Sequence, residues 1–358
     1  MKKLAFAAFA LAVFGAVQAA PIYKFTDLGA LADSSSEASG INNLGEVSGY
    51  SWTNANIYQA TVWRQGTLIP LKYFGGNFSQ AFGINNAGQV VGTSNNATNL
   101  FYPVVWDDST SVRVLSTSTG VAYGINNAGQ ATGLMEVRGI GAHAALWSSA
   151  AEMDLGNGLG LAINDVGRVV GASMYQAIEY DGAYTTNLPG LGGLGTKARA
   201  INHSGLVAGY SWRIGNESTG AVSWESGVLT ELSGLGGRSS EARGINNAGS
   251  IVGWSNRPDD YQRAVIWNGK TVTDLNTFLD ADTINAGWTL ALATGINDSG
   301  SIVGDAVNSN NPGQMRGFLL SAVSAPVPEP STYALLLVGL LMLSVQARIQ
   351  TRHKEHRK

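Results

Sequence analysis

The sequence predicts an all-β fold, a seven-bladed β-propeller of four-stranded blades, and three observations lead to it. Glycine occupies 46 of the 358 positions, 44% of the residues are hydrophobic and only 13% are charged. A glycine inside a helix costs about 1 kcal/mol relative to alanine, so this composition favours short strands and tight turns over a helical bundle. The other two observations are a seven-fold internal repeat and a repeat length typical of propeller blades.

The repeat is a six-residue box built around Ile-Asn. Its seven copies begin at Gly40, Gly83, Gly124, Ala162, Ala200, Gly244 and Gly295. Successive box isoleucines are 43, 41, 38, 38, 44 and 51 residues apart, and propeller blades repeat about every 40–50 residues. Each box ends in Asn-x-x-Gly, and because Asn and Gly tolerate positive φ, each box predicts a tight turn.

Each unit predicts four short strands in order. The first leads into the box, and the second is the β-branched run after it, such as residues 89–92. The third is an apolar stretch that ends in an aromatic residue in units one to six: Trp63, Trp106, Trp147, Tyr180, Trp224 and Trp267. The fourth ends in leucine, as at Leu155. Runs of about five residues between turn signals favour strands over helices.

The two ends of the repeat region complement each other. The seventh unit stops after a third strand at residues 316–320, whereas residues 22–28 have the pattern of a fourth strand and no blade of their own. We expect residues 23–28 to pair with residues 317–322. This pairing would close the ring and leave no incomplete blade with an exposed sheet edge.

Both termini resemble targeting signals. Lys2 and Lys3 precede an apolar run over residues 4–17, which predicts a secretory signal peptide over residues 1–19. Near the other end, Val327, Pro328, Glu329 and Pro330 lead into an uncharged stretch over residues 333–345 and then a basic tail. About 20 apolar residues span a bilayer comfortably, so this stretch is short for a permanent transmembrane helix, although a simple membrane anchor is the alternative.

The order of motif, hydrophobic stretch and basic tail resembles the PEP-CTERM sorting signal of Gram-negative envelopes. The resemblance implies an exosortase, a transpeptidase-like membrane enzyme, as the partner that cuts near Pro328–Pro330. It also implies transient anchoring in the inner membrane, followed by transfer to the cell envelope or extracellular matrix. We therefore expect three regions: a signal peptide over 1–19, the propeller over 20–326, and a sorting segment over 327–358.

The repeat units resemble the HAF family of extracellular repeats. The match consists of the Ile-Asn boxes, Asp27-Leu28-Gly29, and two Gly-Leu-Gly-Gly stretches over residues 190–193 and 234–237. His143 begins the stretch that comes nearest to the namesake triplet of the family. The resemblance implies an extracellular β-rich protein, and it brings no catalytic residues to carry over.

The sequence shows few residues of the kinds that carry catalysis. It has no cysteine and four histidines, two of them in the basic tail, and it lacks the Gly-x-Ser-x-Gly elbow of serine hydrolases. Asp165 and Asp298 stand where other boxes have asparagine, so turn geometry explains them better than calcium binding does. A formal net charge of −3 gives no indication of nucleic-acid binding. We expect no enzymatic activity, no metal and no cofactor.

One position in each unit varies while its surroundings stay constant. After a small residue, and immediately before each box, stand Ser39, Phe82, Tyr123, Leu161, Arg199, Arg243 and Thr294. A constant framework with one divergent position is typical of a binding surface, and neutral drift is the alternative. We expect Phe82, Tyr123, Arg199 and Arg243 to contact a ligand such as exopolysaccharide or an envelope protein. The alternative function is a glycan-active hydrolase or lyase that uses dispersed carboxylates, which meet only in the folded protein.

Overall fold

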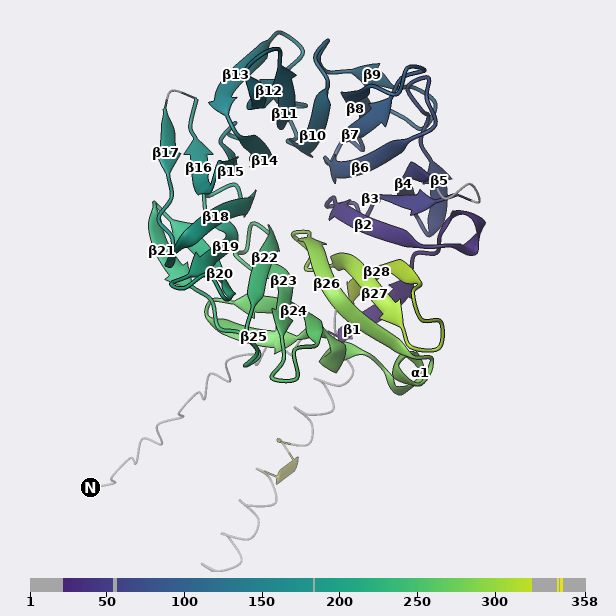
Figure 1. Ribbon diagram of the computed structural model, residues 1–358. Coiled ribbons are helices and arrows are strands. Elements are labelled where there is room, and N and C mark those ends of the chain that lie inside the picture. The colour runs from purple at the N-terminus through teal and green to yellow at the C-terminus, as the bar shows by residue number, and fades with distance from the viewer. Residues whose placement is uncertain (1–21, 54–56, 183, 324–339, 341, 344–358) are drawn as a thin grey trace, which may run out of the picture. The chain divides into compact units, whose positions relative to one another are not determined.

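Seven antiparallel sheets of four strands each surround a central axis (Figure 1). The computed structural model describes residues 22–53, 57–182, 184–323, 340, 342 and 343. Residues Tyr23–Ala322 form one unit. The predicted fold class, a seven-bladed propeller of four-stranded blades, is confirmed.

The first three blades follow the chain in order. Blade 1 contains β2 (Ser36–Ile41), β3 (Val47–Trp52), β4 (Tyr58–Arg64) and β5 (Thr67–Pro70). Blade 2 contains β6 (Ser79–Ile84), β7 (Val90–Asn95), β8 (Phe101–Trp106) and β9 (Arg113–Val114). Blade 3 contains β10 (Gly120–Ile125), β11 (Ala131–Val137), β12 (Gly141–Trp147) and β13 (Glu152–Asn157).

The next three blades repeat the plan. Blade 4 contains β14 (Leu159–Ile163), β15 (Val169–Ser173), β16 (Gln176–Tyr180) and β17 (Thr185–Asn187). Blade 5 contains β18 (Gly192–Ile201), β19 (Val207–Arg213), β20 (Thr219–Glu225) and β21 (Val228–Glu231). Blade 6 contains β22 (Ser240–Ile245), β23 (Ile251–Asn256), β24 (Gln262–Asn268) and β25 (Thr271–Asp274).

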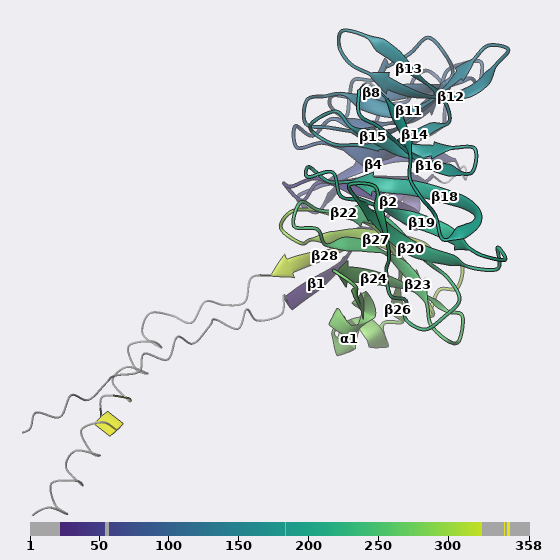
Figure 2. The ribbon, with the colours of Figure 1, turned by 90° about the vertical axis from the view of Figure 1, so that its left-hand side faces the viewer.

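Blade 7 is assembled from both ends of the repeat region. Its strand order is β1 (Ile22–Asp27), β28 (Met315–Val323), β27 (Ile302–Asn308) and β26 (Trp288–Ile296). The backbone N–H of Leu28 donates to the carbonyl of Gly317 at 2.9 Å, and β1 and β28 lie side by side in both ribbon views (Figures 1 and 2). The predicted closure of the ring by the N-terminal strand is therefore confirmed.

The box turns connect the first and second strands of every blade. All seven box glycines have positive φ, from 75° at Gly129 to 89° at Gly205. At such φ values a residue with a side chain is strained. The prediction that these glycines hold the turns is confirmed.

The hydrophobic core is divided into clusters, most of which are shared by neighbouring blades. The cluster between blades 1 and 2, for example, joins Val62 of β4 to Val90 of β7 and Trp106 of β8. Four of the third-strand indoles also donate to a carbonyl of the segment that leads in from the preceding blade: Trp63 to Leu28, Trp106 to Lys72, Trp224 to Pro189, and Trp267 to Ser233. These buried tryptophans therefore hold blades 1, 2, 5 and 6 to the segment that precedes each of them.

Three short helices interrupt the strands among the described residues. They are η1 (Leu31–Asp33), η2 (Leu275–Phe278) and α1 (Ala281–Asn285), and Asp280 caps α1 by accepting from the N–H of Thr283. The last two lie between blades 6 and 7 and account for the longest repeat interval. In the described part of the chain, no helix is long and apolar enough to cross a membrane.

Candidate binding site in the central channel

The seven divergent residues line one cavity on the propeller axis. We call Ser39, Phe82, Tyr123, Leu161, Arg199, Arg243 and Thr294 the bulge ring, because each is the extra residue of a β-bulge in the innermost strand of its blade. The cavity measures about 260 Å³, and Glu37, Tyr50, Leu292 and Asp305 complete its polar and apolar lining. The structure thus brings Phe82, Tyr123, Arg199 and Arg243 together, as the sequence led us to expect. Their role in binding remains a prediction.

A glycine in the second strand permits each bulge. Gly92 in β7 illustrates the arrangement, because a Cβ there would lie 1.9 Å from the carbonyl oxygen of Gln80. The equivalent distance is 1.8–2.0 Å in all seven blades, at Gly49, Gly92, Gly133, Gly171, Gly209, Gly253 and Gly304. Bulges re-aim a side chain and occur often beside functional sites. Here they place one side chain from every blade into the cavity.

Blades 5 and 6 supply a basic half. The guanidinium Nε of Arg199 donates to Oε1 of Glu241 at 2.9 Å, and Nε of Arg243 lies 3.1 Å from the same oxygen. Glu241 is only 7% exposed. Burial and the neighbouring arginine charges lower the pKa of Lys197, which stands beside this group. Two guanidinium groups therefore approach one buried carboxylate, and Lys197 adds a third cation nearby.

Blades 7 and 1 supply an acidic half. Tyr50 pairs with Glu37 across β2 and β3, and its hydroxyl donates to the Glu37 carboxylate. Asp305, on β27, is 4% exposed and accepts from the backbone N–H of Ala38 at 3.1 Å. Burial, reinforced by the charge of Glu37, raises the pKa of Asp305 well above its ordinary value. The cavity thus holds one carboxyl group that favours its neutral form beside a second carboxyl group.

Blades 2 and 3 complete the ring with aromatic side chains. The rings of Phe82 and Tyr123 lie 5.3 Å apart between centroids, at 50° to each other. Burial raises the pKa of the Tyr123 phenol, so its hydroxyl stays protonated at neutral pH. Both residues line the cavity, so this part of the lining is aromatic and uncharged.

The sequence pattern did not indicate Glu37, Tyr50 or Asp305. Tyr50 and Asp305 do belong to a pattern, because the residue after each second-strand glycine also varies between blades. The seven residues are Tyr50, Thr93, Leu134, Ala172, Tyr210, Trp254 and Asp305. This second divergent position pairs with the residue two before each bulge, as Tyr50 pairs with Glu37 and Asp305 with Leu292. These two variable positions, one on the first strand and one on the second strand of each blade, are brought together by the pairing of those strands.

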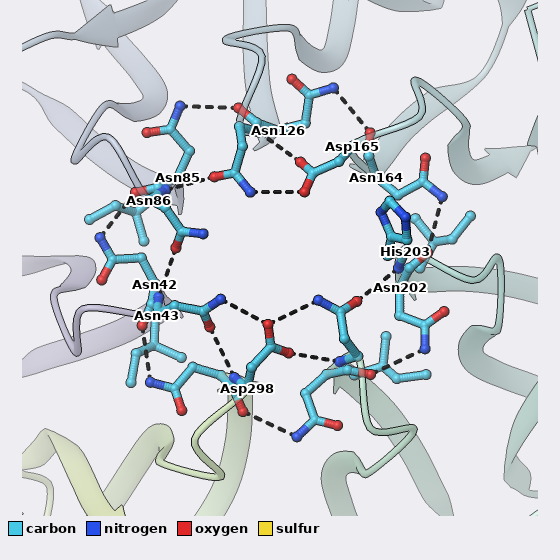
Figure 3. Close-up of a pocket in the computed structure, with 18 of the residues that line it drawn as sticks. Asn42, Asn43, Asn85, Asn86, Asn126, Asn164, Asp165, Asn202, His203 and Asp298 are labelled. Atoms are coloured by element: carbon cyan, nitrogen blue, oxygen red, sulfur yellow. Dashed lines mark hydrogen bonds between the residues drawn. The ribbon is translucent and has the colours of Figure 1, made fainter.

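Further along the same strands, at their C-terminal ends, a ring of asparagines closes around the axis (Figure 3). The asparagine ring consists of Asn42, Asn85, Asn126, Asn164, Asn202, Asn246 and Asn297. Each side-chain Nδ2 donates to the backbone carbonyl of the next member at 3.0–3.2 Å, and Asn297 returns to Asn42. Each Oδ1 also accepts from the N–H four residues later in its own turn, as Asn126 does from Gln130. One amide therefore stabilises both the turn and the junction between blades.

The residue after each ring asparagine forms a second, more exposed circle of bonds. Asp165 accepts from the N–H and Nδ2 of Asn127, and Asp298 does the same for Asn247. Among the described residues the circle is broken only from Asp165 to His203, because an imidazole has no amide oxygen to offer. Bonds between blades, as well as turn geometry, thus account for aspartate at these two positions.

Other candidates from the sequence have structural partners or fall outside the structure. Nδ1 of His143 lies 2.8 Å from both carboxylate oxygens of Asp154. Within the described ranges, no three His, Asp or Glu side chains gather in a way that could hold a metal ion. Val327, Pro328, Glu329 and Pro330 lie outside the described residues, as does the predicted signal peptide over 1–19.

Comparison with known proteins gives fold similarity alone. No protein family matches the chain, and no curated protein does. Among solved structures, TolB from Acinetobacter baumannii aligns with 78% of this chain and 64% of its own, at 11% identity and a TM-score of 0.45. The acylaminoacyl peptidase of Pyrococcus horikoshii aligns over 77% and 51%, at 12% identity and 0.43. The BP39L lectin of Burkholderia pseudomallei aligns over 84% and 99%, at 8% identity and 0.38.

The chain therefore spans less than two thirds of the first two proteins. With identities this low and TM-scores below 0.5, none of these similarities assigns a function.

Proposed function

We propose that this protein is an exported, non-enzymatic binding propeller of the cell envelope or extracellular matrix, and that its ligand occupies the cavity lined by the bulge ring. The observation that supports the proposal is the contrast within each blade. The box, its turn and the second-strand glycine recur, whereas the bulge residue ranges from serine to phenylalanine to arginine. A concave site with a few convergent polar groups on a rigid scaffold is a usual place for a ligand.

A glycan array probed with purified residues 20–326 tests this proposal, because that segment contains the whole Tyr23–Ala322 unit. Envelope proteins from a Gram-negative host serve as a second panel. A Ser39→Trp variant fills the cavity from β2, and Tyr261→Ala, which removes an exposed aromatic ring, is the matched control. We expect Ser39→Trp to lose binding with an unchanged melting temperature, and the control to bind normally. No binding by the wild-type protein, or equal binding by a folded Ser39→Trp, would overturn the proposal.

The sorting part of the proposal rests on the sequence resemblances to PEP-CTERM signals and HAF repeats. A proline disfavours helical geometry at the residue before it, so the Glu329-Pro330 sequence predicts an extended peptide. An extended peptide suits the active site of a protease or transpeptidase. We propose that an exosortase cuts near Pro328–Pro330 after transient anchoring in the inner membrane. Mass spectrometry of the surface-released protein tests this step. An intact C-terminus at Lys358 would show that the tail is an anchor instead.

A glycan-active enzyme is the second candidate, and one observation favours it. Glu37 and Asp305 line the same cavity, and burial favours the neutral form of Asp305. A neutral acid beside a second carboxylate is the arrangement that glycoside hydrolysis uses. Incubation of bound glycans with wild-type protein, Asp305→Asn and Glu37→Gln decides between the two. Chain cleavage by the wild type that both variants abolish would establish the enzyme, and intact glycans would exclude it.

A further inference from the structure

The two cavity arginines share one carboxylate and keep their outer nitrogens available. Both guanidinium groups approach Oε1 of Glu241 through Nε. Among the described residues, none bonds Nη1 or Nη2 of Arg199 or Arg243, although both side chains line the cavity. Their side chains are 26% and 34% exposed, and the Arg199 guanidinium also lies over the Tyr210 ring, 5.7 Å from its centroid. Glu241 therefore orients both arginines and, within the described chain, leaves their Nη1 and Nη2 atoms unbonded for a ligand.

The charges around this pair do not balance. Lys197 and the two arginines are positive and Glu241 is the one carboxylate among them, which leaves an excess of positive charge on β18 and β22. These strands belong to neighbouring blades (Figure 1). Asp305 lines the same cavity, and burial raises the pKa of its carboxyl group well above the ordinary value. An anionic group placed between the arginines would relieve the repulsion and accept paired N–H bonds, which planar guanidinium groups form well with a carboxylate.

The rest of the lining suits a hydroxylated ring. Phe82 and Tyr123 line the cavity, and aromatic rings provide apolar surface against which the C–H groups of a sugar can pack. On the acidic side, the Tyr50 hydroxyl already donates to Glu37, so the Glu37 carboxylate and the Tyr50 oxygen offer acceptors for sugar hydroxyls. The volume of about 260 Å³ is below that of ordinary drug-sized sites, which hold about 300–1,000 Å³. It has room for one sugar unit and not for a polymer running through it.

We propose that the cavity binds one carboxylated sugar unit, a uronate, of an acidic polysaccharide, with its carboxylate between Arg199 and Arg243 and its ring against Phe82 and Tyr123. This inference rests on the proposed binding function and adds the class of ligand. Arg199, Arg243, Phe82 and Tyr123 thereby take distinct roles, the first two in charge recognition and the other two in ring packing.

Isothermal titration calorimetry of residues 20–326 with tri-galacturonate and its carboxyl-reduced counterpart tests the inference, because the two trisaccharides differ only in their carboxylates. We expect binding of the acidic trisaccharide that weakens as salt rises. Arg199→Gln and Arg243→Gln should each weaken it about 10- to 100-fold, because each variant removes charged hydrogen-bond donors to the carboxylate. Arg238→Gln, an exposed arginine of the same part of the chain, is the matched control and should bind as wild type.

Three results would overturn the inference. The first is equal binding of the two trisaccharides by the wild-type protein, with binding lost in Ser39→Trp. This result would support the proposed function but show that the carboxylate plays no role in binding. Binding of inorganic phosphate as strong as that of tri-galacturonate, with Phe82→Ala unchanged, would show a plain anion site. The third is the absence of binding to either trisaccharide. If the glycan array and the protein panel are also negative, the proposed binding function is wrong as well. Unchanged melting temperatures of all variants exclude misfolding as the cause.

Discussion

The asparagine ring allows a quantitative prediction about stability. The side chain of Asn126 is 3% exposed and takes part in four hydrogen bonds. Its Nδ2 donates to the Asn164 carbonyl at 3.0 Å and to Oε1 of Gln130 at 2.9 Å, and its Oδ1 accepts from the N–H groups of Ala128 and Gln130. At about 1 kcal/mol for each bond, Asn126→Ala should lower the free energy of unfolding by about 4 kcal/mol.

Asn126→Asp separates the two kinds of bond. The aspartate keeps both acceptor bonds but directs a carboxylate at two oxygens, so at neutral pH it should lose at least the two donor bonds, about 2 kcal/mol. Those oxygens raise the pKa of the aspartate in the folded state above its unfolded value. Its stability should therefore rise as the pH falls toward 4, relative to Asn126→Ala, because protonation restores a donor.

Urea titration followed by tryptophan fluorescence measures these differences, since Trp147 is buried in the same blade. Asn127→Ala is the matched control. It removes two exposed bonds of the outer circle and should cost less than the Asn126 variants. A loss below about 1 kcal/mol for Asn126→Ala, the size of a typical surface or average substitution, would refute the view that the ring stabilises the propeller.

Three further predictions concern the bulges, the closure and the pH dependence. Gly92→Ala should lower the free energy of unfolding by about 3 kcal/mol, because its Cβ would clash with the Gln80 carbonyl, and this value is the upper end of ordinary overpacking. A urea midpoint within error of wild type would contradict this. Deletion of residues 20–29 removes β1 and the carbonyl that Trp63 bonds, and should lower the melting temperature more than any single substitution above; an unchanged melting curve would disprove the closure. Asp305 has a folded-state pKa above its unfolded value, so its contribution to stability is present below the unfolded pKa and is lost as pH rises toward the folded pKa. Asp305→Asn keeps an acceptor for the Ala38 N–H but does not ionise, so the variant should not lose stability in this way. The free energy of unfolding of the wild type should therefore fall relative to that of the variant between pH 4 and pH 7. Parallel plots of unfolding free energy against pH would contradict the assignment.

The repeat pattern predicted the blades because each blade is a local structure. Strand, turn and strand follow one another within about 40 residues, and the box glycines have the positive φ that Asn-x-x-Gly turns require. The closure by β1 also followed from the sequence, since an incomplete last unit and an unmatched first strand complement each other. The turns depend on residues that are close in the sequence, and the closure follows from counting the strands of the last unit.

The asparagine ring and the bulges could not be predicted in this way. The turn alone accounts for each box asparagine, so the pattern does not indicate a bond to the next blade. Asparagine at all seven positions, Asn42 to Asn297, is nevertheless stricter than a turn demands. The bulges depend on how a second-strand glycine such as Gly92 lies against the first strand. The acidic half of the cavity joins Glu37 of the first unit to Asp305 of the last, and only ring closure brings these two together.

The bulges place variable side chains on a constant backbone. The close contacts at each bulge involve backbone atoms, the small residue before it and the glycine opposite, as with Ala81 and Gly92 around Phe82. Some bulge side chains also have partners, because Arg199 donates to Glu241 and Thr294 donates to the Ala38 carbonyl. Among the described residues, Ser39 has no side-chain hydrogen bond, so exchanges there should cost the fold little. Under the proposed binding function, a chain with the same boxes and other residues at such sites would keep its architecture and bind a different ligand.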